Sequence, residues 1–186
     1  MKRRGKMIKN GIWCEYEGTE YLLWRSYKNR ERIDDDISQA LEFRHISYAE
    51  FLKRLKPGDV VLETLFSPDC KIPRNASDVF HDKSGRIGDE FAVPKSQLTK
   101  AYRYHTGAVY KGIKCDVQGN GMQESLFLQT DEITPDNPLI PKLLNCGFNP
   151  GYPIGYGTFL YEQDVSASDP EIEIFENCTE IDLNAL

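Results

Sequence analysis

Apolar and polar residues alternate over short distances along most of this chain, and a period of two is typical of β-strands. The pattern predicts a hairpin at residues 7–33. Further strands are expected at 41–46, 60–66, 91–93, 102–117, 126–128, 158–162 and 171–175. The apolar run at 60–66 indicates a well-buried strand, whereas strict alternation at 171–175 indicates a half-exposed strand with its glutamates facing water.

Helical patterns are few and short. Ser47 and Glu50 have the spacing of a capping box, which predicts a helix over 48–55. Other short helices are expected at 94–101 and 141–145. Helices of this length cannot cover a parallel sheet, so the sequence favours a β-rich α+β fold with antiparallel sheets.

Two stretches interrupt the pattern. Asp34, Asp35 and Asp36 predict a solvated loop or the N-cap of a short turn, because the Asp-x-Asp-x-Asp-Gly spacing of a calcium loop is missing. Residues 67–89 show little periodicity and contain prolines and glycines, which predicts a long loop or an insertion.

One short pattern occurs twice. Residues 8–18 read IKNGIWCEYEG and residues 109–119 read VYKGIKCDVQG, and each copy is followed by a second apolar run. A repeat at a fixed offset indicates one supersecondary unit used twice, here a β-hairpin. We therefore expect a first β-rich unit at 1–90, with an inserted helix and a long loop, and a second at 91–186. Each would be a small SH3-like barrel or a bent sheet, although a single sheet shared by both copies would also fit.

Charge is divided unevenly along the chain. Residues 1–114 hold 22 Lys and Arg against 16 Asp and Glu, whereas residues 115–186 hold 13 acidic residues and one basic residue, Lys142. This excess of negative charge disfavours nucleic acid as the partner of the second half and fits a cationic protein. A solvated acidic surface that aids solubility is the simpler alternative.

The five cysteines are widely spaced and form no C-x-x-C pair, which argues against a disulfide framework or a zinc site. Cys14 and Cys115 occupy equivalent places in the repeat and are expected to be buried, reduced and unpaired. No apolar run approaches the roughly 20 residues that cross a bilayer. The basic N-terminus lacks the apolar segment of a signal peptide, so we expect cytoplasmic residence without a membrane partner.

Candidate catalytic groups are sparse. Cys70 and His81 share the 67–89 loop, and a Cys–His pair is the minimum for nucleophilic catalysis, but no third orienting group is identifiable. Gly155 and Gly157 lie in a Gly/Tyr-rich turn that lacks the rest of a dinucleotide fingerprint. The sequence therefore assigns no catalytic residue, metal site or cofactor.

Three separated segments, together about a third of the chain, resemble small bacterial immunity proteins of polymorphic-toxin and contact-dependent inhibition systems. They are KNGIWCEYEGTEY at Lys9–Tyr21, YHTGAVYKG at Tyr104–Gly112, and the Gly/Tyr-rich segment Gly147–Tyr161. Residues 46–89 have no counterpart in this pattern. The resemblance implies a non-catalytic protein that binds and neutralises a cognate toxin, with no shared catalytic residues.

Combined with the charge, this resemblance leads to a first hypothesis: an immunity protein that occludes the basic cleft of a toxin domain, such as a nuclease. The expected contact residues are Asp131, Glu132, Glu171, Glu173 and Glu176, with Tyr152 and Tyr156 as aromatic anchors and Asp34, Asp35 and Asp36 as a second patch. A small cytosolic enzyme that uses Cys70, His81, His105 or the Gly/Tyr-rich loop is the alternative. An RNA-binding pair of β-barrels is a third possibility, which the basic first half keeps open.

Overall fold

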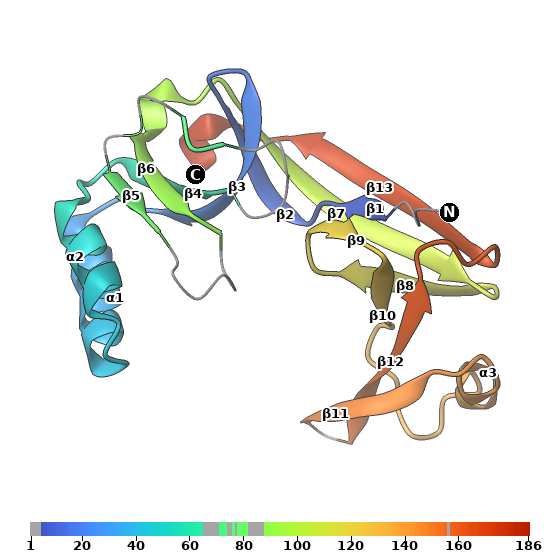
Figure 1. The fold of residues 1–186 in the computed structure, drawn as a ribbon. Coiled ribbons are helices and arrows are strands. Elements are labelled where there is room, and N and C mark those ends of the chain that lie inside the picture. Colours follow the sequence, from blue (N-terminus) through green and yellow to red (C-terminus); the bar gives the residue numbers. More distant parts are fainter. Residues whose placement is uncertain (1–4, 65–70, 74–75, 77, 82–87, 156) are drawn as a thin grey trace. The chain divides into compact units, whose positions relative to one another are not determined.

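The computed structural model describes residues 5–64, 71–73, 76, 78–81, 88–155 and 157–186 (Figure 1). The fold is β-rich α+β with antiparallel sheets, as predicted. The chain forms two compact units: unit 1 contains residues 1–10 and 104–178, and unit 2 contains residues 11–103 and 179–186. These bounds differ from the expected division at residue 90, because strand β1 (Lys6–Ile8) pairs with β9 (Gly121–Gln123) and so joins the later part of the chain.

Unit 1 is built on a sheet with the strand order β11-β12-β10-β8-β7, and β13 also pairs with β7. Residues 104–110 of β7 belong to this unit. Helix α3 (Ile140–Asn145) is the single turn predicted at 141–145. The strands are β7 (Lys100–Tyr110), β8 (Ile113–Gln118), β10 (Ser125–Gln129), β11 (Asn149–Gly155), β12 (Thr158–Ser166) and β13 (Ile172–Glu180).

One face of this sheet forms the core of unit 1. Every second residue of β8, namely Ile113, Cys115 and Val117, is buried there, and Leu126 and Leu128 of β10 lie beside them. Leu143 of α3 and Phe148 are also in this core. Because side chains alternate across a strand, the intervening residues lie on the opposite face.

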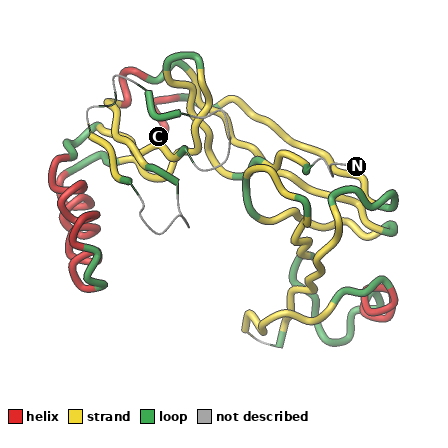
Figure 2. The backbone as a smooth tube through the Cα atoms, in the orientation of Figure 1, coloured by secondary structure: helices red, strands yellow, loops and turns green. Residues whose placement is uncertain are grey.

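Unit 2 contains a sheet with the order β2-β3-β4-β6-β5. Val60 and Leu62 of β4 belong to one buried cluster, whereas Val61 belongs to another that includes the helices, so β4 is buried on both faces. The two helices pack together beside this sheet (Figures 1 and 2). The elements are β2 (Gly11–Tyr16), β3 (Thr19–Ser26), α1 (Arg30–Glu42), α2 (Ile46–Arg54), β4 (Asp59–Glu63), β5 (Asp78–Phe80), β6 (Glu90–Pro94), and two 3-10 turns at Lys95–Gln97 and Leu183–Ala185.

Helix α1 corrects the interpretation of the three aspartates. Asn29 precedes the helix and accepts a hydrogen bond at Oδ1 from the backbone N–H of Arg32, 3.1 Å away. Ile33, Ile37 and Ala40 then recur at helical spacing and form the buried stripe. Asp34, Asp35 and Asp36 therefore lie within the helix, because the capping residue is five positions earlier than expected.

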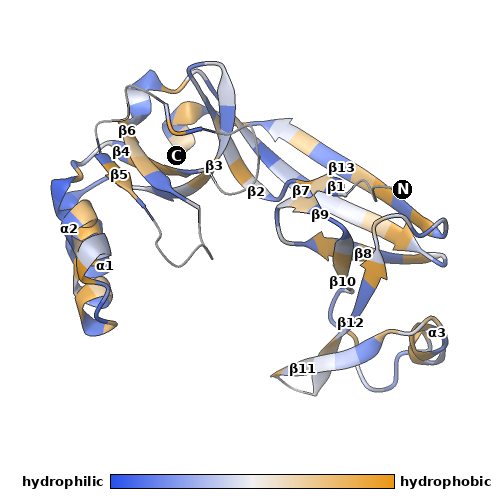
Figure 3. Ribbon diagram, viewed as in Figure 1, coloured by the Kyte–Doolittle hydropathy of each residue, from blue (hydrophilic) through white to orange (hydrophobic). Residues whose placement is uncertain are grey.

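The strand expected at 41–46 is also wrong, because this segment contains the end of α1, the turn and the start of α2. Leu41, Phe43 and Ile46 are apolar, yet 43%, 67% and 57% of their surfaces are exposed. Ser47 does not cap α2, since the N-cap is His45, whose side chain makes no capping bond. The expected helix at 94–101 is reduced to a 3-10 turn, with β7 starting soon afterwards. Figure 3 shows the alternation of apolar and polar residues along these helices.

The two copies of the repeat place their tight turns at different points, at the end of the first copy and near the start of the second. Glu17 and Gly18 join β2 to β3 with φ of 49° and 76°, and Lys111 and Gly112 join β7 to β8 with φ of 50° and 69°. Positive φ at both central residues is the geometry of a type I′ hairpin turn. The second copy differs from the first after strand β8. Strand β9 lies between β8 and its return strand β10 in the sequence, so Asn120-Gly121 does not form a two-residue hairpin turn.

Cys14 and Cys115 lie in β2 and β8 as free, buried thiols. Burial raises the pKa of Cys14 to about 12 and that of Cys115 to about 11. Since the thiolate is the reactive species, we expect both to react with a thiol reagent far more slowly than the exposed Cys178. Mass spectrometry of a labelling time course would measure this. Serine at either position should lower the free energy of unfolding by about 1–3 kcal/mol. Equally fast native labelling of all three would contradict the burial.

Candidate binding surface

The solvent-facing side of the unit 1 sheet carries polar side chains where the other side carries the core. Gly107 of β7, Asp116 of β8, Gln129 of β10 and Glu162 of β12 occupy directly opposed positions in neighbouring strands. Gln118, Phe127 and Asp164 form the next row. Directly opposed residues share a face, so both rows lie on the same side of the sheet.

Strand β13 extends this face beyond β7. A Cβ atom built on Gly107 would clash with the ring of Phe175, so this ring covers the glycine on the outer side. Glu171 and Glu173 are four and two residues from Phe175 and therefore lie on the same side of the sheet as its ring, whereas Ile172 and Ile174 pack against the core. We call the carboxylates of this side the acidic face: Asp116, Glu162, Asp164, Glu171 and Glu173.

Hydrogen bonds fix part of the acidic face. Nε2 of Gln118 donates to Oε1 of Gln129 at 3.1 Å, and Nε2 of Gln129 donates to Oε1 of Glu162 at 2.8 Å. The Glu162 carboxylate also lies against Gly151, where an added Cβ would come within 2.7 Å of it. This chain of amides holds Glu162 in one orientation, so that side chain needs little further ordering to accept a partner.

Basic side chains also lie on or beside this side of the sheet, and exposed Lys114 alternates with the core residues of β8 in step with Asp116. Nε2 of His105 lies 3.0 Å from Oδ1 of Asp116, and Nζ of Lys111 lies 3.6 Å from Oε2 of Glu171. Within the described ranges, no basic side chain is within ion-pairing distance of Glu162, Asp164 or Glu173. Uncompensated carboxylates on one face produce a negative potential that attracts a cationic partner.

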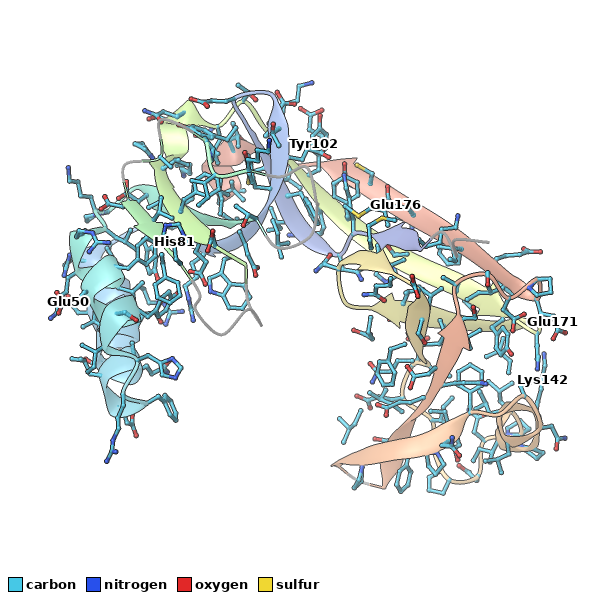
Figure 4. All side chains as sticks on the ribbon, in the orientation of Figure 1. Glu50, His81, Tyr102, Lys142, Glu171 and Glu176 are labelled. Atoms are coloured by element: carbon cyan, nitrogen blue, oxygen red, sulfur yellow. The ribbon has the colours of Figure 1, made fainter. Side chains whose placement is uncertain are left out.

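The predicted contact residues separate into different places. Glu171 directly precedes β13, and Glu173 and Glu176 lie in this strand. Figure 4 labels Glu171 and Glu176. Glu176 has the parity of the core residues, although it is exposed, and so lies outside the acidic face. Asp131 and Glu132 are exposed beside the start of β12, since Ile133 bridges to Phe159. Three strands, β10, β8 and β7, lie between β12 and β13, so the predicted carboxylates are not one patch.

The remaining predicted contact residues are the two aromatic anchors and the three aspartates of the second patch. Tyr152 is in β11, but its side chain and all of Tyr156 lie outside the described residues. In unit 2, the Asp36 carboxylate already has a hydrogen-bond partner, because the Tyr27 hydroxyl donates to its Oδ2 atom at 2.7 Å. Asp34 pairs with Arg30 at 2.9 Å, and Asp35 is exposed on α1.

Sequence reasoning missed five residues of this surface. Asp116, Glu162 and Asp164 were counted only in the overall charge, and the half-buried rings of Phe127 and Phe175 were read only as strand residues. The sequence signal for these five residues is that each one alternates with residues of the core along its strand. Parity alone could not bring them together, since the order of the strands decides which carboxylates become neighbours.

The alternative catalytic groups are not brought together by the described part of the chain. Cys70 lies outside the described residues, and the Nδ1 atom of His81 is 3.1 Å from Oδ2 of Asp89 in unit 2. His105 belongs to unit 1. Among the residues described, no three His, Cys, Asp or Glu side chains are arranged to hold a metal ion.

Unit 2 holds a buried pair of carboxylates that the sequence did not single out. Glu63 of β4 and Glu90 of β6 are directly opposed, with exposed fractions of 4% and 2%. The Tyr48 hydroxyl donates to Oε2 of Glu90 at 3.0 Å, and the Gly88 N–H points at Oε1 of Glu63 from 3.4 Å. Burial raises the pKa of Glu63, while the Gly88 N–H lowers it by a smaller amount.

This raised pKa has a consequence for stability. The folded chain holds the Glu63 proton more tightly than the unfolded chain, so the contribution of Glu63 to stability is greatest below its unfolded pKa and is lost as pH rises through the raised pKa of the folded state. Glu63→Gln removes the charge, and we expect it to raise the free energy of unfolding near pH 7 and to flatten its dependence between about pH 4 and 7. Urea denaturation at several pH values would measure this, with the exposed Glu50→Gln as the matched control. A destabilised Glu63→Gln at neutral pH would contradict the assignment.

No helix among the described residues is both long and apolar enough to cross a membrane. No protein-family model, curated protein or solved structure matches the chain.

Proposed function

We propose that this chain is a non-catalytic inhibitor of the immunity-protein type, which binds a cationic toxin domain through the acidic face of unit 1. The observation that carries the proposal is the group of carboxylates on one side of the sheet, of which Glu162, Asp164 and Glu173 have no basic side chain within ion-pairing distance in the described ranges. Residues 104–178 hold eleven acidic residues against three basic ones.

The chemistry of a toxin nuclease supports this choice of partner. An enzyme that cleaves nucleic acid must bind phosphates, so its cleft is basic, and an acidic surface is complementary to it. Charge of this kind accelerates encounter and fixes orientation, whereas a few central aromatic residues supply much of the affinity. Phe127 and Phe175 are partly exposed among the carboxylates and fit that second role.

The test is to co-express the chain with the product of the neighbouring open reading frame. If the proposal is right, the product of the neighbouring reading frame arrests growth when it is expressed by itself, and co-expression of this chain relieves the arrest. The two proteins should also co-purify as a complex that weakens as salt is raised. Isothermal titration at several salt concentrations then measures the affinity. A neighbour that does not arrest growth, or an arrest that the chain does not relieve, would count against the proposal.

A further inference from the structure

Strand β13 forms an edge of the unit 1 sheet. Among the described strands it pairs only with β7, and its long outer side has no strand beside it. Most of its nine residues are exposed. An edge of this length presents a row of backbone N–H and C=O groups that another chain can join.

Two hydrogen bonds show which backbone groups face outward. The N–H of Lys111 donates to the carbonyl of Glu171 at 3.4 Å, and the N–H of Ile181 donates to the carbonyl of Ala101 at 2.9 Å. Glu171 and Ile181 are an even number of residues apart, so odd-numbered residues between them direct their backbone groups towards β7. Even-numbered residues, including Ile174, Glu176 and Cys178, direct theirs to the free side.

We propose that an extended, basic segment of the partner protein pairs with the free side of β13 as an added strand. This inference rests on the proposed function and specifies how its partner is held. Backbone hydrogen bonds would supply affinity, and side chains at alternate positions would supply selectivity.

The charges of β13 select the partner. Glu171, Glu173 and Glu176 are exposed along the edge, and a second copy of β13 would place like charges beside them, which is destabilising. Lysine or arginine in an incoming strand would instead lie opposite carboxylates. The same glutamates therefore disfavour self-association and favour a basic strand.

The test uses a capped peptide as long as β13, with alternating lysine and valine, and the full chain at low salt. The control peptide has the same charge but carries N-methyl groups on two adjacent central amides, which blocks pairing along both of its edges. We expect the control to bind at least about tenfold more weakly, which corresponds to the loss of about one or two net hydrogen bonds. Cys178→Pro, which removes an outward N–H, should weaken the first peptide by a similar factor relative to Cys178→Ala.

Amide hydrogen exchange measured by NMR gives an independent readout. Binding should slow exchange at Ile174, Glu176 and Cys178 by about tenfold or more, and leave Glu173 and Phe175 little changed, because their amides already face β7. Equal binding of both peptides would overturn strand addition while leaving the acidic face as a cation-binding surface. Failure of both peptides to bind would also overturn it, and the growth assay would still decide the proposed function separately.

Discussion

Reversing three carboxylates of the acidic face, as Asp164→Lys, Glu171→Lys and Glu173→Lys, should weaken binding of the basic partner about a hundredfold or more at low salt. All three residues are exposed, and Asp164 and Glu173 make no ion pair within the described ranges, so the fold should survive. The physical reason is that attraction becomes repulsion between charges that meet across the interface, at a cost of a few kcal/mol. Isothermal titration against salt measures both the affinity and its slope, which should flatten.

The matched control makes the same change of charge in unit 2, as Asp34→Lys, Asp35→Lys and Glu42→Lys on α1. These residues include two of the three aspartates first considered as a second patch. We expect this control to bind within about threefold of the parent, because α1 contributes no carboxylate to the acidic face. If the α1 variant lost binding and the acidic-face variant kept it, the interface would belong to unit 2.

Asn10→Ala should lower the free energy of unfolding of unit 1 by about 2–4 kcal/mol. The Asn10 side chain connects three segments: its Nδ2 atom donates to the carbonyls of Val117 and Gly119, each at 2.8 Å, and its Oδ1 atom accepts from the N–H of Thr106 at 2.7 Å. Alanine leaves the Thr106 N–H and the Val117 carbonyl without these partners, and unsatisfied groups of this kind cost more than a hydrogen bond contributes.

Urea denaturation monitored by circular dichroism would measure the loss. The control is Asn145→Ala, an exposed asparagine at the end of α3, for which we expect a change below about 0.5 kcal/mol. Asn10→Asp is a sharper variant, because it keeps the acceptor for Thr106 and replaces the donor with a second acceptor. It should therefore be almost as destabilising as alanine. An Asn10→Asp protein as stable as the parent would show that the two donated bonds contribute little.

The Asn10 network gives a structural role to the Lys9-Asn10-Gly11 segment of the repeat, because the Asn10 side chain connects Thr106 to Val117 within unit 1. The equivalent residue of the second copy is Lys111, which occupies a type I′ turn instead. A shared pattern thus serves two different local purposes.

Local signals predicted the elements that depend on neighbours in sequence. Alternation at 171–175 predicted the half-exposed strand β13, and the apolar run at 60–66 predicted the buried strand β4, as far as the described residues extend. The error at 41–46 came where apolar residues are not buried. Leu41, Phe43 and Ile46 resemble a strand in composition, but they lie at the end of α1, in the turn and at the start of α2, with much of their surface exposed. Hydrophobicity by itself does not state which face will be covered.

The sequence determined by itself the β-rich class, the turn chemistry and the excess of acidic residues after residue 114, because these depend on composition and on short-range periodicity. Only the tertiary structure decided which carboxylates are neighbours. Asp116, Glu162 and Asp164 share a face because β8, β10 and β12 are adjacent, whereas Asp131 and Glu132 lie apart from β13. Strand order arises from long-range pairing and the burial of a common core, and neither is encoded in any single stretch of the chain.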